Sequence, residues 1–252
     1  MKMKVNDIEL YYEVYGEGEP LILCHGWMDD CSIWKSQIEF FAKKYKVIVY
    51  DHRGHGKSDK PEKNYSIQTL SNDLYSLIQK LNLEKIMIMG NSMGGMTAMV
   101  FALGYPDKVS KLVLVGTTAR MAFSIRVQLW IMMHILPYES FARGVIDYKY
   151  YEPSEQVIKE AMERALRTPK YAAHECSLEF TKNYDIMDRI SKIKVPTLII
   201  VGDKDKITPV EMSQHLSRKI EGSKLEIIPN SKHIPMIDKV KELNEITEKF
   251  IR

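Results

Sequence analysis

The chain is poor in cysteine, in long apolar runs and in net charge, and each shortage excludes a class of protein. Three cysteines in 252 residues, with no Cys-x-x-Cys pair, argue against a disulfide framework and against a cysteine-bound zinc ion. The 36 Lys and Arg exceed the 33 Asp and Glu by only three charges, too weak a surplus to predict nucleic-acid binding. The most apolar window, 129–136, contains His134 and is too short to span a membrane. The first ten residues lack the apolar segment of a signal peptide, so we expect a cytoplasmic protein.

What the chain does contain is the composition and the alternation of an α/β protein. Hydrophobic residues make up 45% and charged residues 27%, as in ordinary globular domains. Short, continuously apolar runs predict strands that are covered on both faces, and residues 4–15 predict an additional strand or hairpin. Helical patterns separate these runs, which favours a mostly parallel sheet with helices on both faces. The predicted strands are 20–24, 46–50, 85–89, 111–115, 197–201 and 224–228, and the predicted helices are 66–81, 93–103, 210–220 and 238–251.

One long segment, 118–190, breaks the alternation of strands and helices. It contains no convincing strand, is rich in helix-forming residues and is divided by Pro137, Pro153 and Pro169. We therefore expect a helical insertion at 118–190, with the α/β core formed by 1–117 and 191–252.

A glycine-flanked serine follows the predicted strand 85–89. Residues 90–94 read Gly-Asn-Ser-Met-Gly and match the pattern G-x-S-x-G, with a small-residue helix behind them. Glycine at both flanks allows a turn tight enough to hold Ser92 in a strained backbone conformation at the C-terminal end of a central strand. A serine in such a position can act as a nucleophile if a base removes its proton.

A candidate base and a candidate acid follow the last two predicted strands. His233 comes just after strand 224–228, so we expect it at the same edge of the sheet as Ser92. Asp203 and Asp205 follow strand 197–201, and either could orient the imidazole and stabilise its cation. The chain order serine, aspartate, histidine is the order found in one fold in particular.

Four motifs in order resemble those of the α/β-hydrolase superfamily over nearly the whole chain. Beyond the serine turn they are Cys-His-Gly-Trp at 24–27, Asp-His-Arg-Gly-His-Gly-Lys-Ser-Asp at 51–59 and Gly-x-x-Asp-x-x-x-Pro at 202–209. The resemblance implies an α/β-hydrolase fold in which the insertion 118–190 is the cap. It implies Ser92 as nucleophile and His233 as general base and acid. The acid motif favours Asp205 over Asp203 as the orienting acid.

The same resemblance implies an oxyanion hole made by the backbone N–H groups of Trp27 and Met93. It involves no metal and no cofactor. Nearby polar residues have a structural interpretation: His25, His52, Arg53 and His55 brace loops, and Asp30 is a solvated loop charge. Bulky side chains in the cap predict an apolar substrate pocket. Its candidate residues are Trp27, Met93, Phe123, Trp130, Met133, His134 and Tyr138.

These features favour a serine carboxylesterase that cleaves small to medium, largely apolar esters through an acyl-enzyme intermediate. The His-Gly-Trp motif looks like that of aryl esterases and cofactor-free haloperoxidases, for which perhydrolysis is a related activity. The serine turn also resembles that of hydrolases that cleave carbon–carbon bonds in ring-fission products, and enol-lactonases are a further alternative. A non-catalytic ligand-binding protein is the alternative of another class. The expected partner is a small-molecule ester, and the chain is a monomer or a homo-oligomer.

Overall fold

The computed structural model of the protein describes residues 1–121 and 123–252. Eight strands form one sheet in the order β1-β2-β4-β3-β5-β6-β7-β8. The pairs β1–β2 and β2–β4 are antiparallel and all other neighbouring strands are parallel, which confirms the expected mostly parallel sheet. The strands are β1 Lys2–Val5, β2 Ile8–Tyr15, β3 Pro20–Cys24, β4 Lys46–Tyr50, β5 Ile86–Asn91, β6 Val109–Val115, β7 Thr197–Gly202 and β8 Lys224–Ile228.

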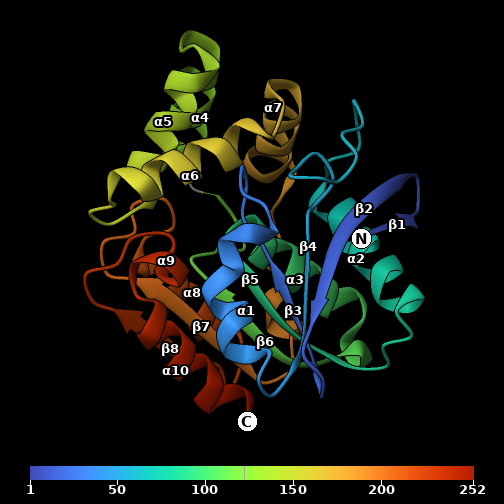
Figure 1. The fold of residues 1–252 in the computed structure, drawn as a ribbon. Helices are drawn as coiled ribbons and strands as arrows, with labels where there is room; N and C mark the ends of the chain where they lie inside the picture. Colours follow the sequence, from blue (N-terminus) through green and yellow to red (C-terminus); the bar gives the residue numbers. More distant parts are fainter. Residues whose placement is uncertain (122) are drawn as a thin grey trace.

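Helices cover both faces of this sheet, as expected. Helices α1 and α10 contact each other on one face, and α2 and α3 pack together on the other, while α8 lies against β7 and β8 (Figure 1). The central strands β5 and β7 are buried along their whole length because they are covered on both sides. The helices of the core are α1 Lys35–Phe41, α2 Ile67–Lys80, α3 Met93–Gly104, α8 Val210–Lys219, α9 Pro235–Asp238 and α10 Val240–Ile251.

Helix α2 shows how the sequence produces one of these elements. The Ser66 hydroxyl accepts a hydrogen bond from the Thr69 N–H at 3.0 Å and so caps the first turn. Behind the cap, Leu70, Leu74 and Leu77 recur at helical spacing and are buried against the core.

Four further helices lie between β6 and β7, in the segment where the sequence predicts no strand. Figure 1 shows them together at one end of the sheet, above the carboxyl ends of the parallel strands. One isolated bridge, Arg120 with Asp185, joins the two ends of this segment. We call this segment the cap. Its helices are α4 Phe123–Ile135, α5 Tyr138–Lys149, α6 Glu155–Leu166 and α7 Lys170–Leu178.

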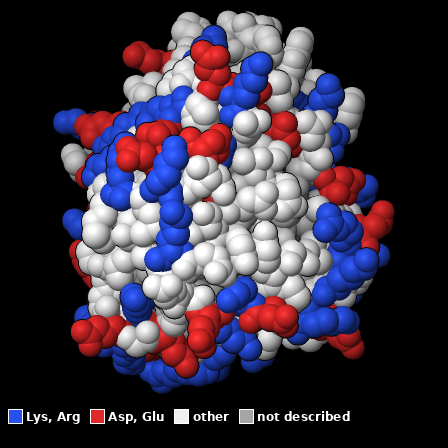
Figure 2. All heavy atoms as spheres, turned by 90° about the vertical axis from the view of Figure 1, so that its right-hand side faces the viewer, with Lys and Arg blue, Asp and Glu red and all other residues white. Residues whose placement is uncertain are grey.

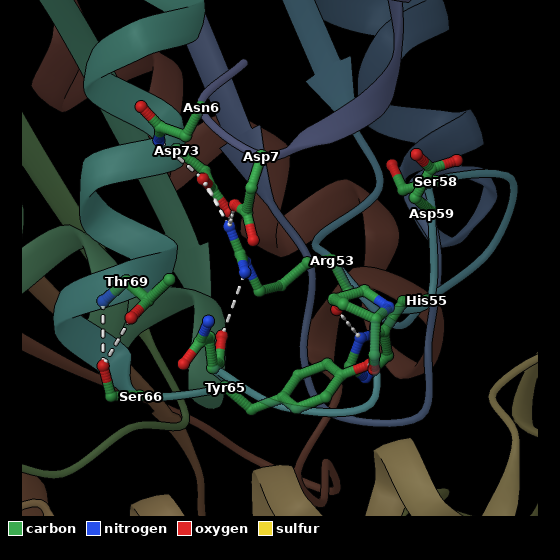
Figure 3. A network of polar contacts seen from close by, with 12 residues as sticks. Asn6, Asp7, Arg53, His55, Ser58, Asp59, Tyr65, Ser66, Thr69 and Asp73 are labelled. Atoms are coloured by element: carbon green, nitrogen blue, oxygen red, sulfur yellow. Dashed lines mark hydrogen bonds and ion pairs between the residues drawn. The ribbon is translucent and has the colours of Figure 1, made fainter. Parts of the chain in front are cut away.

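The loop after β4 is fastened to the N-terminal hairpin by a buried arginine (Figure 3). Arg53 donates to both oxygens of Asp73 on α2, at 2.6 and 2.8 Å, and to Asp7 between β1 and β2 at 2.8 Å. Its guanidinium is almost fully buried, so these carboxylates replace the water that the charge has lost. The contacts hold the loop 51–59 rigidly beside the site described below.

The part of the chain that the structure describes includes no helix with both the length and the apolar character needed to cross a membrane. On the face seen in Figure 2, Lys and Arg side chains alternate with Asp and Glu around a broad uncharged area.

Candidate active site

Ser92 occupies a strained turn between β5 and α3. Its φ is +53° and its ψ is −118°, a conformation that L residues rarely adopt. The neighbouring backbone comes close enough to require glycine: a Cβ at position 90 would lie 2.5 Å from the Gly94 carbonyl oxygen, and one at position 94 would lie 2.2 Å from that of Cys24. Strain of this kind persists only where the surroundings enforce it, and it presents the serine side chain at the edge of the sheet.

Asp205 and His233 meet at the same edge. His233 Nδ1 lies 2.8 Å from Asp205 Oδ2, and both side chains are buried. The Asp205 carboxylate also accepts hydrogen bonds from the N–H groups of Ile207 and Thr208 at 2.8 and 2.9 Å. These contacts hold the carboxylate in place and leave the second imidazole nitrogen of His233 available to the cavity.

The neighbouring Asp203 has other contacts. It lies 3.0 Å from Lys204 Nζ and accepts a long hydrogen bond from Ser231 N–H at 3.4 Å. Between the two aspartates that the sequence offered, the structure therefore brings Asp205, and not Asp203, to the imidazole.

Trp27 and Met93 both line the cavity together with Ser92. Met93 begins α3, so its N–H has no acceptor one turn earlier in the helix. In the described residues, neither the Trp27 N–H nor the Met93 N–H donates a backbone hydrogen bond. The two loops are in close contact, since a Cβ added to Gly26 would lie 3.3 Å from Ser92 Cβ. Two free donors beside a serine are the elements of an oxyanion hole.

The loop that carries Trp27 is braced from below by histidines, as the sequence predicts. His25 Nδ1 donates to the Gly26 carbonyl oxygen at 2.8 Å, and His25 Nε2 accepts from the His52 N–H at 2.9 Å. Cys24, next to His25, is fully buried, and burial raises the pKa of its thiol to about 12. The thiol therefore stays protonated and is unsuited to nucleophilic chemistry.

Asn91, one residue before the serine, is a contact that sequence reasoning missed. Its side-chain amide donates to the carbonyl oxygens of Val115 and His233, each at 3.1 Å. It thus connects the serine turn to the histidine loop across the end of β6. The motif treats position 91 as variable, so the sequence carries no signal for this role.

One cavity joins these groups beneath the cap, and its walls are mainly apolar. The cavity volume is about 80 Å³, enough for a group of several heavy atoms. The lining residues are Trp27, Ser92, Met93, Met96, Met121, Ile125, Gln128, Leu129, Met132, Val145, Tyr148, Lys149, Phe180, Lys206, Ile207 and His233.

The five cap residues that the sequence predicted for the pocket lie outside this lining. Helix α4 turns Ile125, Leu129 and Met132 toward the cavity, and at about 100° per residue this places Phe123, Trp130 and His134 on its opposite side. Phe123 and Trp130 are accordingly 76% and 56% exposed. The other two predicted residues pack within the cap: the Ser177 hydroxyl donates to Met133 Sδ at 3.1 Å, and the Tyr138 hydroxyl to the Thr168 carbonyl at 2.6 Å.

Asp30 also differs from its prediction as a solvated charge. Its side chain is 4% exposed and lies 2.5 Å from Arg167 Nη1 in the cap. The cap covers this loop, which is why the charge is buried and paired. Within residues 1–121 and 123–252, no group of three or more His, Cys, Asp or Glu side chains is arranged to hold a metal ion.

Comparison with known proteins agrees with this geometry. The family model for the alpha/beta hydrolase fold matches residues 19–240. The chain is 27% identical to 3-oxoadipate enol-lactonase 2 of Acinetobacter baylyi, over 99% of this chain and 96% of that protein. It is 28% identical to 2-hydroxy-6-oxo-6-(2'-aminophenyl)hexa-2,4-dienoic acid hydrolase of Metapseudomonas resinovorans, over 97% of this chain and 88% of that protein. The chain is also similar to the solved structure of a thermophilic esterase from Thermogutta terrifontis, with 28% identity and a TM-score of 0.91. The match covers all of this chain and 97% of the esterase chain.

An eight-stranded, mostly parallel sheet with a strained serine turn at its edge defines an α/β hydrolase. The chain belongs to the alpha/beta hydrolase fold family.

Proposed function

We propose that the protein is a serine hydrolase that cleaves carboxylic esters of small to medium, largely apolar substrates through an acyl-enzyme intermediate. The observation that carries the proposal is the convergence of Ser92 and the Asp205–His233 pair on one apolar cavity. The solved esterase structure named above, similar over the whole chain, supports the same class of reaction.

In the proposed reaction, His233 takes the proton of the Ser92 hydroxyl as the oxygen attacks the ester carbonyl. The negative charge that develops on the carbonyl oxygen is stabilised by the N–H groups of Trp27 and Met93. His233 then gives its proton to the leaving alcohol, and water activated by His233 hydrolyses the acyl-enzyme. Asp205 holds the imidazole in the correct tautomer and stabilises its cation throughout.

Ser92 makes no side-chain hydrogen bond to the parts of the chain that the structure describes. A catalytic hydrogen bond to His233 need not be formed before substrate binds, since such bonds are often long in the free enzyme and tighten in the complex.

Substitution of the serine tests the proposal directly. We expect Ser92→Ala to lower kcat for p-nitrophenyl acetate by about 10⁴-fold or more, because the nucleophile is lost while the fold remains. The matched control is Ser191→Ala, an exposed serine in a turn away from the cavity, which should retain wild-type turnover. Wild-type turnover by Ser92→Ala would contradict the proposal.

A second candidate reaction is supported by the enol-lactonase that the chain resembles over nearly its whole length. Opening of a lactone uses the same acyl-enzyme chemistry, and Lys206 in the lining gives the cavity a cationic group that an apolar ester does not need. A panel of p-nitrophenyl esters, enol-lactones and a ring-fission diketone separates the possibilities. Fast turnover of short esters supports the esterase, and a preference for lactone or diketone supports the alternatives. Ligand binding without any turnover would instead support a binding protein.

A further inference from the structure

Three ion pairs join the cap to the loop that follows β3, two at Asp29 and one at Asp30. Asp29 contacts Lys149 Nζ at the end of α5, and its other oxygen lies 3.7 Å from Arg164 Nε on α6. Asp30 pairs with Arg167, just beyond α6. The side chains of Asp29 and Lys149 are only 2% and 6% exposed, whereas that of Arg167 is 44% exposed. The Asp29–Lys149 pair is therefore closed off from water, whereas the Asp30–Arg167 pair is open to water on the arginine side.

Lys149 touches both loops that form the candidate active site. Its Nζ donates to the Trp27 carbonyl oxygen at 3.4 Å, within the loop that carries a proposed oxyanion donor. Its backbone carbonyl accepts a hydrogen bond from the His233 N–H at 3.0 Å. Its side chain also lines the cavity together with Ser92. A shift of Lys149 would thus reach the base and the oxyanion donor at the same time.

The cap holds the same loop by one more polar contact. The indole N–H of Trp27 donates to the Ala173 carbonyl oxygen on α7 at 3.0 Å, and the indole ring packs edge-on against Phe141 and Phe180. The Trp27 side chain is therefore fixed by α7, and its backbone by Lys149. The two contacts leave little freedom for the N–H group between them.

Because the Lys149–Asp29 pair is buried, it contributes little net stability to the fold. Taking two charges out of water costs several kcal/mol per ion, and apolar replacements of such pairs are often neutral or stabilising. A buried pair does, however, define one geometry, and oxyanion donors must be placed to within about 0.5 Å. Because the pair lies beside Trp27 and His233, its fixed geometry can hold the Trp27 N–H and the imidazole in the positions that catalysis requires.

We infer that Lys149 is a positioning residue of this hydrolase: through Asp29 and the Trp27 carbonyl it holds the oxyanion loop, and through its own carbonyl it holds the His233 loop, in register with Ser92. The inference rests on the proposed function for its kinetic consequence. The physical connection between the two loops can be tested separately from activity.

Hydrogen exchange tests that connection. We expect Lys149→Met, which keeps the unbranched side chain up to its terminal atom and removes the charged amine, to accelerate amide exchange several-fold in 25–31 and in 231–234. The matched control, Arg167→Met, breaks the ion pair between Arg167 in the cap and Asp30 in the loop. It should accelerate exchange only around 30–32. Unchanged exchange of both loops in Lys149→Met would overturn the inference whether or not the protein hydrolyses esters.

Steady-state kinetics test the consequence for catalysis. In Lys149→Met we expect kcat for p-nitrophenyl acetate to fall about 10- to 100-fold, with KM within about twofold of the wild-type value. Misplaced N–H donors stabilise the transition state less well, whereas binding of the ester in its ground state depends on them little. Affinity for a trifluoromethyl ketone, which forms a tetrahedral adduct with the serine, should fall by the same factor. Lys149→Arg should recover part of the loss.

A double variant separates positioning from general damage. Lys149→Met/Asp29→Asn should lose less activity than the product of the two single losses, because both changes remove the Lys149–Asp29 pair, and only Asp29→Asn also removes the contact with Arg164. Unchanged kcat in Lys149→Met, or an effect on KM alone, would overturn the inference. A wild-type protein that turns over no ester would overturn the proposed function instead, and the exchange experiment would still decide the role of Lys149.

Discussion

At the scale of single residues, the proposed chemistry depends on side chains that the sequence identifies by local motif. Ser92, Asp205 and His233 each follow a strand and sit in a short recognisable pattern, so their meeting at one sheet edge follows from the topology of a parallel sheet. Lys149 carries no such pattern. Its partner Asp29 lies 120 positions away, and only the path of the cap brings them together.

The two candidate acids provide a matched comparison. We expect Asp205→Asn to lower kcat by about 10⁴-fold, because an amide cannot hold the imidazole in the required tautomer. Asp203→Asn should change kcat less than threefold, since its contacts are with Lys204 and Ser231. The measurement is turnover of p-nitrophenyl acetate by both variants at equal protein concentration. A large loss of kcat in Asp203→Asn with a small loss in Asp205→Asn would assign the role of the orienting acid to Asp203.

At the scale of elements, the strands were the most predictable part of the fold. All six predicted core strands agree with the structure to within two residues at each end, because buried parallel strands have continuously apolar sequences. Helix α1 was not predicted. It has seven residues, Lys35–Phe41, too few for a helical repeat to stand out from a loop.

The orientation of the cap helices could not be predicted from composition. Helix α4 is apolar on nearly all sides, so its sequence does not tell which side faces the substrate. The structure turns Ile125, Leu129 and Met132 inward and leaves Ile135, at the end of the helix, 72% exposed. The side facing the cavity is set by tertiary packing on α5 and on the turn at Glu179–Asn183.

Helix α4 should therefore limit the length of the acyl group that the cavity accepts. We expect Met132→Ala to enlarge the cavity and to raise kcat/KM for the p-nitrophenyl butyrate and hexanoate esters relative to the acetate by about tenfold, since one or two accommodated methylenes are worth roughly 1–3 kcal/mol. The control is Ile135→Ala on the exposed end of the helix, which should leave the ratio unchanged. An equal shift in both variants would assign the effect to loosening of the cap rather than to the cavity wall.

At the scale of the whole molecule, a group of buried histidines links the fold to pH. His25, His52 and His55 lie together beneath the loop that carries Trp27, with ring centroids 4.6 to 6.5 Å apart. The Nε2 atoms of His52 and His55 are buried and have no partner among the residues that the structure describes. Burial, with the neighbouring His25, lowers the pKa of His52 well below 6.5 and that of His55 to about 3. Lys60 adds to the effect on His55, and Asp30 opposes it weakly.

These depressed values make the folded protein sensitive to acid. Below about pH 6.5 the unfolded chain binds protons on His52 and His55 that the folded chain does not, so the free energy of unfolding falls as the pH falls. Each histidine contributes roughly 1 kcal/mol per pH unit until the folded pKa is reached. Between pH 6.5 and 5.5 most carboxylates remain ionised, so the histidines dominate the slope in this window.

We expect urea unfolding to show a loss of stability from pH 6.5 to 5.5 that is reduced by about half in His52→Leu, because one of the two titrating groups is gone. Measurement at pH 8, where these histidines are neutral in both states, isolates the effect of the substitution on packing, and subtracting it leaves the pH-dependent part. Equal slopes in the wild type and the variant would show that His52 takes up a proton in the folded state. The loop beneath Trp27 would then have to open in mild acid, and the protection factors of its amides, which correct for the intrinsic pH dependence of exchange, would be lower there than at pH 8.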